Sequence, residues 1–340
     1  MRVAEPAQQR QTIPVSLSSA PFLAADVGGT YARIGLVQGA RGAAATVLAY
    51  RKYLCADYTS LAAILTDFLS KEAAGTRIGR CALACAGYVL DGTVINYNLP
   101  WKVSLPELRS ALGIESMSLI NDFEAVAHAA QFVDPAKTEL LAGPERGSGP
   151  LIVVGPGTGL GSAVCIPGRH GATVLATEAG QTSLAPGTTR EREVLDRLAR
   201  DGDYVSYERL LCGPGMCTLY RVLSEMRGAK ATLDTPEAVT LAAMQASDSV
   251  ALETLHIFCG LLGGFVGNMA LLYGARGGVY LTGGILPGMR EFLVKSQFVN
   301  RFLDKGRMRP FLERVPVRLM EHGQLGVIGA AGCYLESLEE

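Results

Sequence analysis

The amino-acid sequence predicts an α/β protein of two domains with a ligand site between them. At 22–37 the residue types indicate a strand, a glycine turn and a second strand, with Gly28 and Gly29 in the turn. The same pattern returns at 151–166, where four glycines alternate with other residues. The chain of 340 residues is long enough for two domains of roughly 150 residues each. Two copies of one hairpin in such a chain indicate two related halves that face one ligand.

Both glycine turns are suited to binding phosphate. Glycine lacks a Cβ, so such a turn adopts positive φ and brings its backbone amides against a ligand. Glycine turns also form ordinary β-hairpins, and the second copy is what favours the phosphate interpretation. Leu160 and Ser162 occupy the places where a dinucleotide-binding turn has its last glycine, and the chain lacks the Gly-Lys-Ser/Thr of a P-loop. The two turns resemble the first and second phosphate loops of the actin-like ATPase superfamily, whose members include sugar kinases.

The composition argues against several classes of function. The chain carries 31 basic and 32 acidic side chains, a formal net charge of −1, so we expect no nucleic-acid partner and no membrane partner. The eight cysteines include no Cys-x-x-Cys pair and no Cys/His cluster at zinc spacing, which indicates reduced thiols in a cytoplasmic protein. Residues 1–20 contain several Gln and Ser and lack an apolar run, so we expect a disordered N-terminal tail.

The first half continues in the order of an α/β domain. Residues 44–50 are suited to a third strand, and Ser60 begins a helix whose apolar side chains recur on one face. A short buried strand is expected at 81–86, followed by a loop at 87–101. A second helix is expected at 104–111.

Asn121 and Asp122 stand where a strand beginning at Ser116 passes into a helix. In an open α/β sheet, ligands bind at the carboxyl ends of the strands. Aspartate also caps helices well, so Asp122 has a purely structural interpretation. A phosphotransferase that acts on a hydroxyl needs a carboxylate within hydrogen-bond reach of that hydroxyl, to accept its proton. Asp122 is the best candidate for this base, and Asn121 for holding a neighbouring hydroxyl.

The second half is predicted to be rich in helices. Helices are expected at 189–200, 215–226, 236–246 and 250–273, strands at 278–282 and 315–319, and a terminal helix at 326–338. The run Ile257–Tyr273 is apolar enough to suggest a membrane span. It is short and contains Asn268 and four glycines, so a buried core helix explains it better. The terminal helix is expected to pack back on the first domain.

Short motifs along the chain form an ordered set. They are Asp26-Val-Gly-Gly-Thr30 with Ala32-Arg33, Asn98-Leu-Pro-Trp101, Ile120-Asn-Asp-Phe123, Gly157-Thr-Gly-Leu-Gly161, Ser206-Tyr-Glu-Arg209 with Gly213-Pro-Gly215, and Thr282-Gly-Gly284. In this order they resemble bacterial glucokinases of the ATP-dependent, non-ROK type, from Phe22 to the C-terminus. The resemblance implies an actin-like, ribonuclease H-like ATPase fold, with nucleotide and sugar between two domains. We expect these domains to be 21–131 with 321–340, and 132–320.

The resemblance implies roles for polar residues around a sugar. Asp122 would deprotonate the sugar 6-hydroxyl, with Asn121 beside it. Glu178 and Glu208 would accept hydrogen bonds from glucose hydroxyls, as ionised carboxylates do well. Asn98 falls where the family has an asparagine close to the sugar.

The sequence departs from the family pattern at two positions. The family has a histidine that contacts glucose where this chain has Gln181, and commonly an asparagine where this chain has Tyr31. Gln181 donates and accepts hydrogen bonds but carries no charge, so the affinity for glucose and the identity of the sugar are open to change. The alternatives are a kinase for another hexose or amino sugar, and a non-catalytic sugar-binding regulator on the same fold. A polymerising actin-like ATPase is a third, but it would leave the sugar-facing carboxylates without a ligand.

The resemblance also implies a nucleotide site for ATP. Mg²⁺ would bind Asp26 through water, because Mg²⁺ keeps several waters and accepts few carboxylates. Arg33 would assist there or form a structural ion pair. From the resemblance we also expect a homodimer. The residues expected at ATP are Ala25, Asp26, Val27, Gly28, Gly29, Thr30, Arg33, Gly157, Thr158, Gly159, Gly283 and Gly284.

Overall fold

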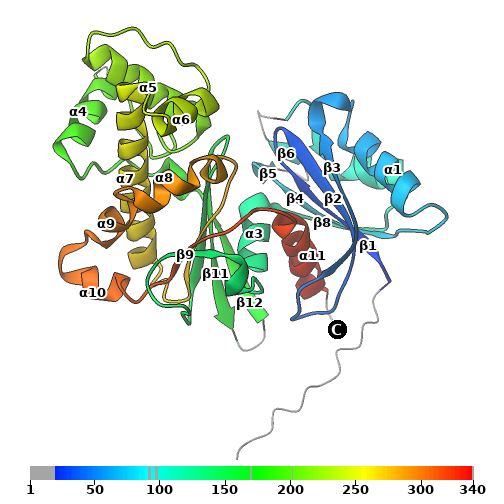
Figure 1. The fold of residues 1–340 in the computed structure, drawn as a ribbon. Helices are drawn as coiled ribbons and strands as arrows, with labels where there is room; N and C mark the ends of the chain where they lie inside the picture. The colour runs from blue at the N-terminus through cyan, green and yellow to red at the C-terminus, as the bar shows by residue number, and fades with distance from the viewer. Residues whose placement is uncertain (1–19, 91–92, 96–98, 169–170, 201, 339–340) are drawn as a thin grey trace, which may run out of the picture.

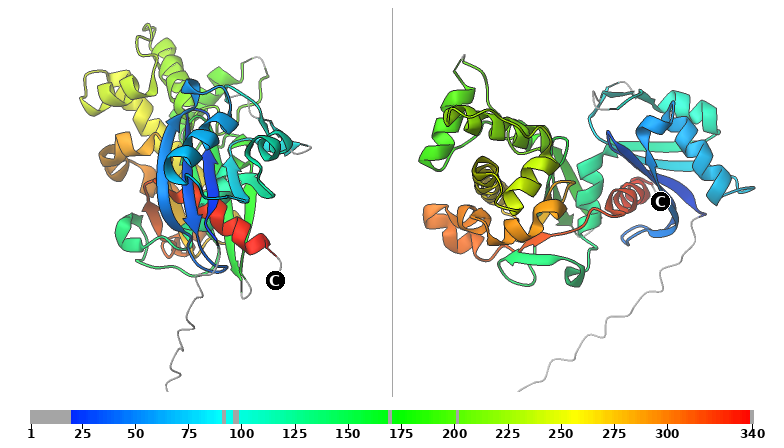
Figure 2. Two further views of the ribbon diagram at one scale, coloured as in Figure 1. Left: turned by 90° about the vertical axis from the view of Figure 1, so that its right-hand side faces the viewer. Right: turned by 45° about the horizontal axis from the view of Figure 1, so that its top comes forward.

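Two large β-sheets, each covered by helices on both faces, and a small three-stranded sheet make up the fold of the described residues (Figure 1). The computed structural model describes residues 20–90, 93–95, 99–168, 171–200 and 202–338. Helices α3 (Asp122–Ala130) and α11 (Leu325–Ser337) lie side by side between the two sheets in all views (Figures 1 and 2). The predicted tail at 1–20 falls almost wholly outside the described residues.

The first sheet has five strands in the order β3-β2-β1-β4-β8. Strands β1 and β2 form the antiparallel hairpin of the first glycine turn, and β4 and β8 continue the sheet in parallel. Their bounds are β1 (Phe22–Val27), β2 (Tyr31–Gln38), β3 (Thr46–Leu54), β4 (Arg80–Cys85) and β8 (Ser116–Asn121). This is the strand order expected when two parallel strands extend an N-terminal hairpin.

Alternate side chains of β1 face different helices on the two sides of the sheet. Leu23 and Ala25 pack in a core with α1 (Leu61–Glu72) and α2 (Leu105–Leu112). Phe22 and Ala24 pack on the other face with α11. Because side chains alternate along a strand, Asp26 belongs to the face covered by α11. The terminal helix therefore packs on the first sheet, as predicted.

The second sheet has six strands in the order β12-β11-β10-β13-β14-β9. Its hairpin β10–β11 carries the second glycine turn. The bounds are β9 (Glu139–Ala142), β10 (Leu151–Pro156), β11 (Leu160–Gly168), β12 (Gly171–Thr177), β13 (Gly278–Leu281) and β14 (Val317–Leu319). Ile152 and Val154 face α5 (Gly213–Met226) and α7 (Ser249–Leu272), whereas the other face is covered by α3.

The predicted helices of the second half are confirmed within a few residues. Besides α5 and α7 they include α4 (Thr189–Leu198) and α6 (Pro236–Met244). Thr188 begins α4 with a capping box, because Thr188 and Glu191 each accept a hydrogen bond from the other's backbone N–H. Helix α7 is long and apolar enough to cross a membrane, but it is mostly buried inside the protein, as a core helix is.

Several elements differ from the prediction. Strand β3 continues to Leu54. The stretch 87–101, predicted as a loop, contains strands β5 (Tyr88–Leu90) and β6 (Thr93–Ile95), which pair with each other, and β6 also pairs with β7 (Val103–Ser104). The chain between β13 and β14 forms three short helices that were not predicted, namely α8 (Arg290–Lys295), α9 (Phe298–Leu303) and α10 (Arg309–Leu312). Single turns of 3-10 helix complete the fold at η1 (Cys55–Asp57), η2 (Pro135–Lys137), η3 (Ala179–Gln181), η4 (Leu286–Met289) and η5 (Gly306–Met308).

The two halves of the chain are joined through α3 and α11. Helix α3 contacts β10, β11 and β12 of the second sheet as well as β4 and β8 of the first. Helix α11 packs along α3, so the first turn of each helix lies near the glycine turns. The proposed domain boundary after residue 131 stays a prediction.

Candidate active site

A cavity of about 470 Å³ lies where the two glycine turns approach each other. Its wall includes Gly28 and Gly29 from the first turn and the second turn from Gly157 to Gly161. Residues far apart in the sequence meet here, because both turns stand at the carboxyl ends of central strands. The other lining residues are Ala86, Gly87, Asn121, Asp122, Phe123, Gly155, Ser162, Thr177, Glu178, Gln181, Glu208, Gly283 and His322.

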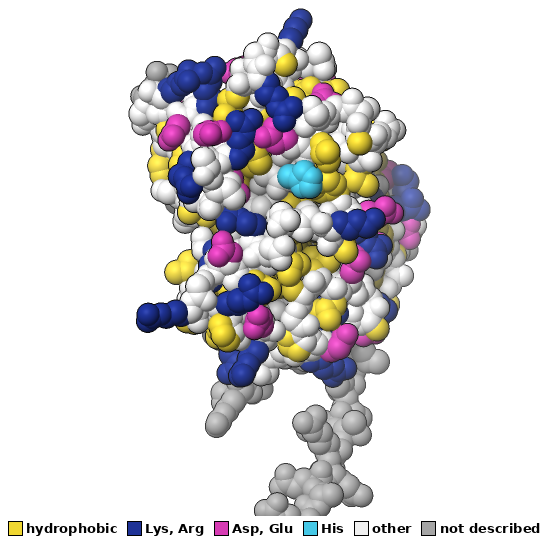
Figure 3. All heavy atoms as spheres, turned by 60° about the vertical axis from the view of Figure 1, so that its left-hand side comes forward, with side chains coloured by type: hydrophobic (Ala, Val, Ile, Leu, Met, Phe, Trp, Pro, Cys, Tyr) yellow, Lys and Arg dark blue, Asp and Glu magenta, His cyan; other side chains and the backbone are white. Residues whose placement is uncertain are grey.

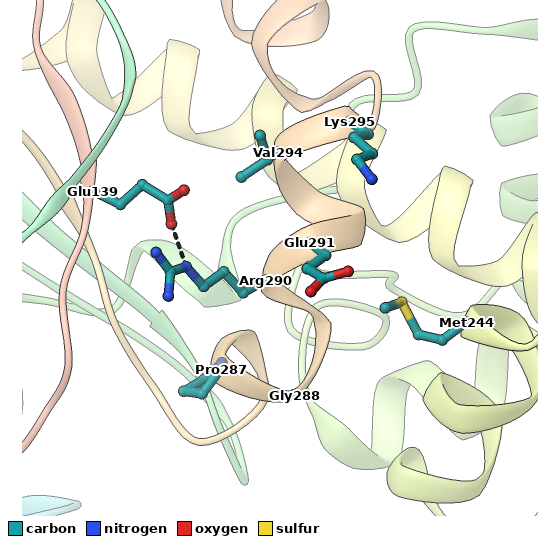
Figure 4. A pocket seen from close by; sticks show the side chains of 8 residues that line it. All are labelled: Glu139, Met244, Pro287, Gly288, Arg290, Glu291, Val294 and Lys295. Carbon is teal, nitrogen blue, oxygen red and sulfur yellow. Dashed lines mark hydrogen bonds and ion pairs between the residues drawn. The ribbon is translucent and has the colours of Figure 1, made fainter.

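A second, more peripheral cavity lies against α8 and does not contain these groups. Met244, Glu291 and Val294 line it, and Arg290 forms an ion pair with Glu139 there (Figure 4). Basic, acidic and hydrophobic side chains intermix on the face of the molecule shown in Figure 3. This cavity offers neither glycine-turn amides nor an unpaired carboxylate cluster, so the cavity between the turns is the candidate site.

Asn121 and Asp122 divide two tasks at the start of α3. Asn121 is the N-cap, since its Oδ1 accepts hydrogen bonds from the backbone N–H groups of Phe123 and Glu124 at 2.9 and 3.3 Å. The capping interpretation therefore applies to Asn121. Its Nδ2 donates to Gly87 O at 3.4 Å. Asp122 is left to line the cavity, with Oδ1 accepting from Phe123 N at 2.9 Å.

The Asp122 carboxyl has an unusual proton affinity. Burial raises its pKa to about 7, and the negative charges of Asp26 and Glu178 contribute to the increase, while the hydrogen bond from Phe123 N opposes it. A carboxyl group with a pKa near neutrality is suited to accept a proton during a reaction.

The ring of Phe123, the residue after Asp122, packs against glycines on either side of the second glycine turn. A Cβ placed on Gly155 would lie 2.6 Å from Phe123 Cζ, and a Cβ on Gly161 would overlap the same ring. Both positions therefore need glycine so that the ring can pack on the face of the β10–β11 hairpin, over the paired residues Gly155 and Gly161. Asp122, next to Phe123, is placed relative to the turn by this packing.

Glu208 and Gln181 form the opposite wall of the cavity. Glu208 Oε2 accepts a hydrogen bond from Leu160 N at 2.8 Å, and Glu208 Oε1 accepts one from Gln181 Nε2 at 2.8 Å. The Gln181 backbone carbonyl in turn accepts from the Tyr204 hydroxyl at 2.6 Å. Glu178, the residue before the short helix η3, lines the same wall. Two carboxylates and an amide thus line the same cavity as Asp122.

Asp26 lies behind the cavity wall, since only 2% of its surface is exposed. Arg33 Nη1 pairs with Asp26 Oδ2 at 3.2 Å, as expected for opposite residues of the β1–β2 hairpin. The charge of Asp26 still reaches the cavity, because it contributes to raising the pKa of Asp122. The described residues contain no cluster of three or more metal-ligating side chains. A divalent metal beside Asp26 would therefore take most of its ligands from phosphate and water, as Mg²⁺ commonly does.

The remaining residues expected at the nucleotide fall into three groups. Gly283, in the left-handed region at φ 108°, and the exposed Thr158 line the cavity. Ala25 and Val27 are buried inside β1, and their side chains face the core. Thr30 and Gly284 are exposed but do not line the cavity, and Asn98 lies outside the described residues.

His322 was not predicted from the sequence. It lines the cavity from the segment between β14 and α11, and its Nε2 lies 3.8 Å from Asp26 Oδ2. Burial lowers the pKa of His322, while the charge of Asp26 opposes the shift. The signal available in the sequence was a histidine between a predicted strand and a glycine-rich helix.

Two glycine turns line one cavity with a carboxyl group whose pKa lies near 7 and with two further carboxylates, which is the set of groups that a phosphotransferase site in an α/β protein of the actin-like ATPase class contains. The chain belongs to the glucokinase family, whose model matches residues 23–337. It is 44% identical to a glucokinase-like protein of Xylella fastidiosa strain Temecula1 over 95% of this chain and 98% of that one. It is 39% identical to a glucokinase of Paramagnetospirillum magneticum over 91% of this chain and 96% of that one. The crystal structure of a glucokinase from an Antarctic psychrotroph has a TM-score of 0.81 and 34% identity, covering 92% of this chain and 98% of that one.

Proposed function

We propose that this protein transfers the γ-phosphoryl group of ATP to the 6-hydroxyl of D-glucose, giving glucose 6-phosphate and ADP. Membership of the glucokinase family supports the reaction class. The observation that carries the assignment of residues is Asp122, a carboxyl of pKa about 7 in the one cavity that both glycine turns line among the described residues.

Asp122 acts as the general base. Its carboxylate accepts the proton of the 6-hydroxyl while that oxygen forms a bond to the γ-phosphorus and the bond to the β-phosphate oxygen breaks. Phosphoryl transfer depends mainly on positioning, so Phe123 contributes by holding Asp122 relative to the second turn. The backbone amides of Gly28 to Thr30 and Gly157 to Gly159 hold the phosphates.

The sugar lies against the opposite wall. Glu178 and Glu208 accept hydrogen bonds from its hydroxyls, Gln181 holds Glu208 in place, and Asn121 and Asn98 complete the contacts. Glu208 retains lone pairs beyond the two used by Leu160 N and Gln181 Nε2, so it has capacity for a hydroxyl.

Asp26 holds Mg²⁺ through water. Bound Mg²⁺ supplies positive charge near the phosphate oxygens where negative charge builds up. Arg33 holds the Asp26 carboxylate in place by its 3.2 Å contact. We further propose that the protein works in the cytoplasm, with reduced thiols, and as a homodimer; all eight cysteines are free.

Purified protein with MgATP and glucose, assayed for ADP release, tests this proposal. Asp122→Ala should lower kcat at least about 1,000-fold while the Kd for glucose changes less than about threefold. The exposed Asp196→Asn on α4 is the control and should leave both values unchanged. Retention of most of the turnover by Asp122→Ala would remove Asp122 as the base.

A kinase for another hexose or for an amino sugar is the second candidate, and Gln181 is the observation that favours it. An uncharged amide bonded to Glu208 presents a different set of donors from an imidazole. The same assay with fructose, mannose, galactose and N-acetylglucosamine separates the candidates, because the substrate with the highest kcat/KM identifies the sugar. Sugar binding without turnover of any of them would indicate a regulator.

A further inference from the structure

His322 stands on the segment that crosses from the second sheet to the first. This segment leaves β14, which belongs to the second sheet, and enters α11, which packs on the first. Its backbone turns at Gly323, with φ 44°, and Leu325 N donates to His322 O at 2.9 Å. The position of the imidazole is therefore tied to both halves of the chain.

The imidazole completes an enclosure around Asp26. Arg33 Nη1 and His322 Nε2 approach the same oxygen, Asp26 Oδ2, at 3.2 and 3.8 Å. The first turn of α11 closes a third side, because a Cβ on Gly326 would lie 2.5 Å from Asp26 Cγ. The N-terminal end of a helix carries positive partial charge and favours a carboxylate there.

His322 is also the member of this enclosure that lines the cavity. Neither Asp26 nor Arg33 contributes to the wall, whereas His322 lies there with Gly28, Gly29 and Gly283. Its Nδ1 is buried and has no hydrogen-bond partner within the described part of the chain. A buried polar atom without a partner is costly, which indicates a role beyond filling space.

We propose that His322 is a positioning residue for the metal end of the nucleotide site. Its Nε2 lies 3.8 Å from Asp26 Oδ2, so it acts on this oxygen by electrostatic attraction and not by a hydrogen bond. Because His322 stands on the crossing segment, the orientation of the carboxylate depends on how the two halves are placed. This inference rests on the proposed role of Asp26 toward Mg²⁺. The contacts of Arg33 and His322 both use Oδ2, and neither uses Oδ1.

Calorimetric titration of the full chain with ATP, once in excess EDTA and once in excess Mg²⁺, tests the proposal without turnover. His322→Ala should weaken binding of ATP in Mg²⁺ about tenfold and change binding in EDTA less than about twofold, because a displaced carboxylate costs about 1.4 kcal/mol of metal-dependent binding. His322→Gln keeps a donor and should restore most of the loss. The exposed His256→Ala, whose ring stacks on Phe292, is the matched control and should bind like the wild type.

Two results would overturn the proposal. An equal loss in Mg²⁺ and in EDTA would mean that His322 touches the phosphates directly, and no loss in either would mean that Asp26 does not depend on it. The variant Asp26→Asn tests the proposed metal role by itself, because it should lose the Mg²⁺-dependent part of the affinity for ATP. If Asp26→Asn loses this part and His322→Ala does not, the role of His322 is wrong and the role of Asp26 stands. If His322→Ala fails to fold, His322→Leu, which keeps bulk and lacks a donor, should show the same Mg²⁺-specific loss.

Discussion

The ring of Phe123 packs against Gly161, in the space that any larger residue at 161 would fill. Gly155, opposite Gly161 in the β10–β11 hairpin, faces the same ring. The first turn of α3 is therefore joined to the second glycine turn by aromatic packing. Since Asp122 precedes Phe123, this contact sets the distance between the proposed base and the phosphate amides.

Gly161→Ala should disturb the packing between the start of α3, which carries Asp122, and the second glycine turn. The new Cβ overlaps the Phe123 ring, so the ring and the start of α3 must move, at a cost of about 1–3 kcal/mol in stability. A shift of about 1 Å in a reacting group costs on the order of 100-fold in rate, so we expect kcat to fall between tenfold and 100-fold. Steady-state kinetics with MgATP and glucose measure the effect, and thermal unfolding measures the stability.

Gly288→Ala is the matched control, because a Cβ there has no atom within 4 Å. It should leave kcat and stability unchanged. Replacing the ring by a smaller side chain, in the double variant Gly161→Ala with Phe123→Leu, should recover part of the stability. Full activity in Gly161→Ala would show that Phe123 does not place Asp122.

The pKa of Asp122 predicts the pH profile. The base must be ionised, and a pKa of about 7 means that its ionised fraction falls about tenfold per pH unit below neutrality. We therefore expect kcat/KM for glucose to rise with pH through about 7 and then to level off. Direct measurement of glucose 6-phosphate at each pH avoids the pH dependence of coupling enzymes. A flat profile from about pH 5 to 7 would contradict the assignment.

The same shift makes a prediction for stability. The folded-state pKa of about 7 lies above the unfolded value of about 3.9, so the folded protein holds this proton more tightly. Below about pH 4, Asp122 is protonated in both the folded and the unfolded state and does not lower the free energy of unfolding. Above about pH 7 it is ionised in both states, and the burial of its charge lowers the free energy of unfolding by the full amount. Asp122→Asn should therefore raise the free energy of unfolding at about pH 8, by at most about 4 kcal/mol, and raise it less as the pH falls toward 4.

Chemical denaturation at several pH values measures this difference. The surface variant Asp196→Asn on α4 should show no pH-dependent gain. A constant difference for Asp122→Asn across the range would mean that the carboxyl is not buried as described.

The sequence predicted the parts of the site that local chemistry determines. Glycine turns after apolar runs and the Asn-Asp pair at a strand-to-helix join follow from backbone rules, and the cavity contains them. The assignment of the N-cap to Asn121 could not be predicted, because aspartate and asparagine cap equally well. The place of His322 in the site could not be predicted, because it depends on the proximity of His322 to Asp26. The two residues are distant in the sequence and come close only after α11 packs on the first sheet.

The secondary structure likewise divides into elements that the local sequence predicts and elements that depend on tertiary contacts. Long periodic helices such as α7 were predicted almost to the residue, since their apolar pattern is read locally. The short helices α8 to α10 have too few turns for a pattern, and the strands β5 and β6 are stabilised by pairing with each other. Such elements depend on tertiary contacts that a single sequence does not display.

The last prediction concerns the hydrogen bond that Gln181 Nε2 donates to Glu208 Oε1 at 2.8 Å. Gln181→Ala removes this bond and leaves Glu208 held by Leu160 N alone. A hydrogen bond to a charged group contributes about 1.5–3 kcal/mol, so we expect the KM for glucose to rise at least about tenfold. In its proposed role Glu208 binds the sugar equally in the ground state and the transition state, so kcat should change less than about threefold.

Two further substitutions at position 181 test the sign of the interaction. Gln181→His keeps a donor and should stay within about threefold of the wild-type KM, whereas Gln181→Glu sets a second carboxylate against Glu208 and should raise KM on the order of 100-fold. The exposed Asp196→Asn on α4, which is remote from the cavity lining, is the control and should match the wild type. Two carboxylates at this distance repel each other unless a proton or a cation lies between them. An unchanged KM for glucose in Gln181→Glu would therefore show that the Gln181 amide is not what holds Glu208 for the sugar.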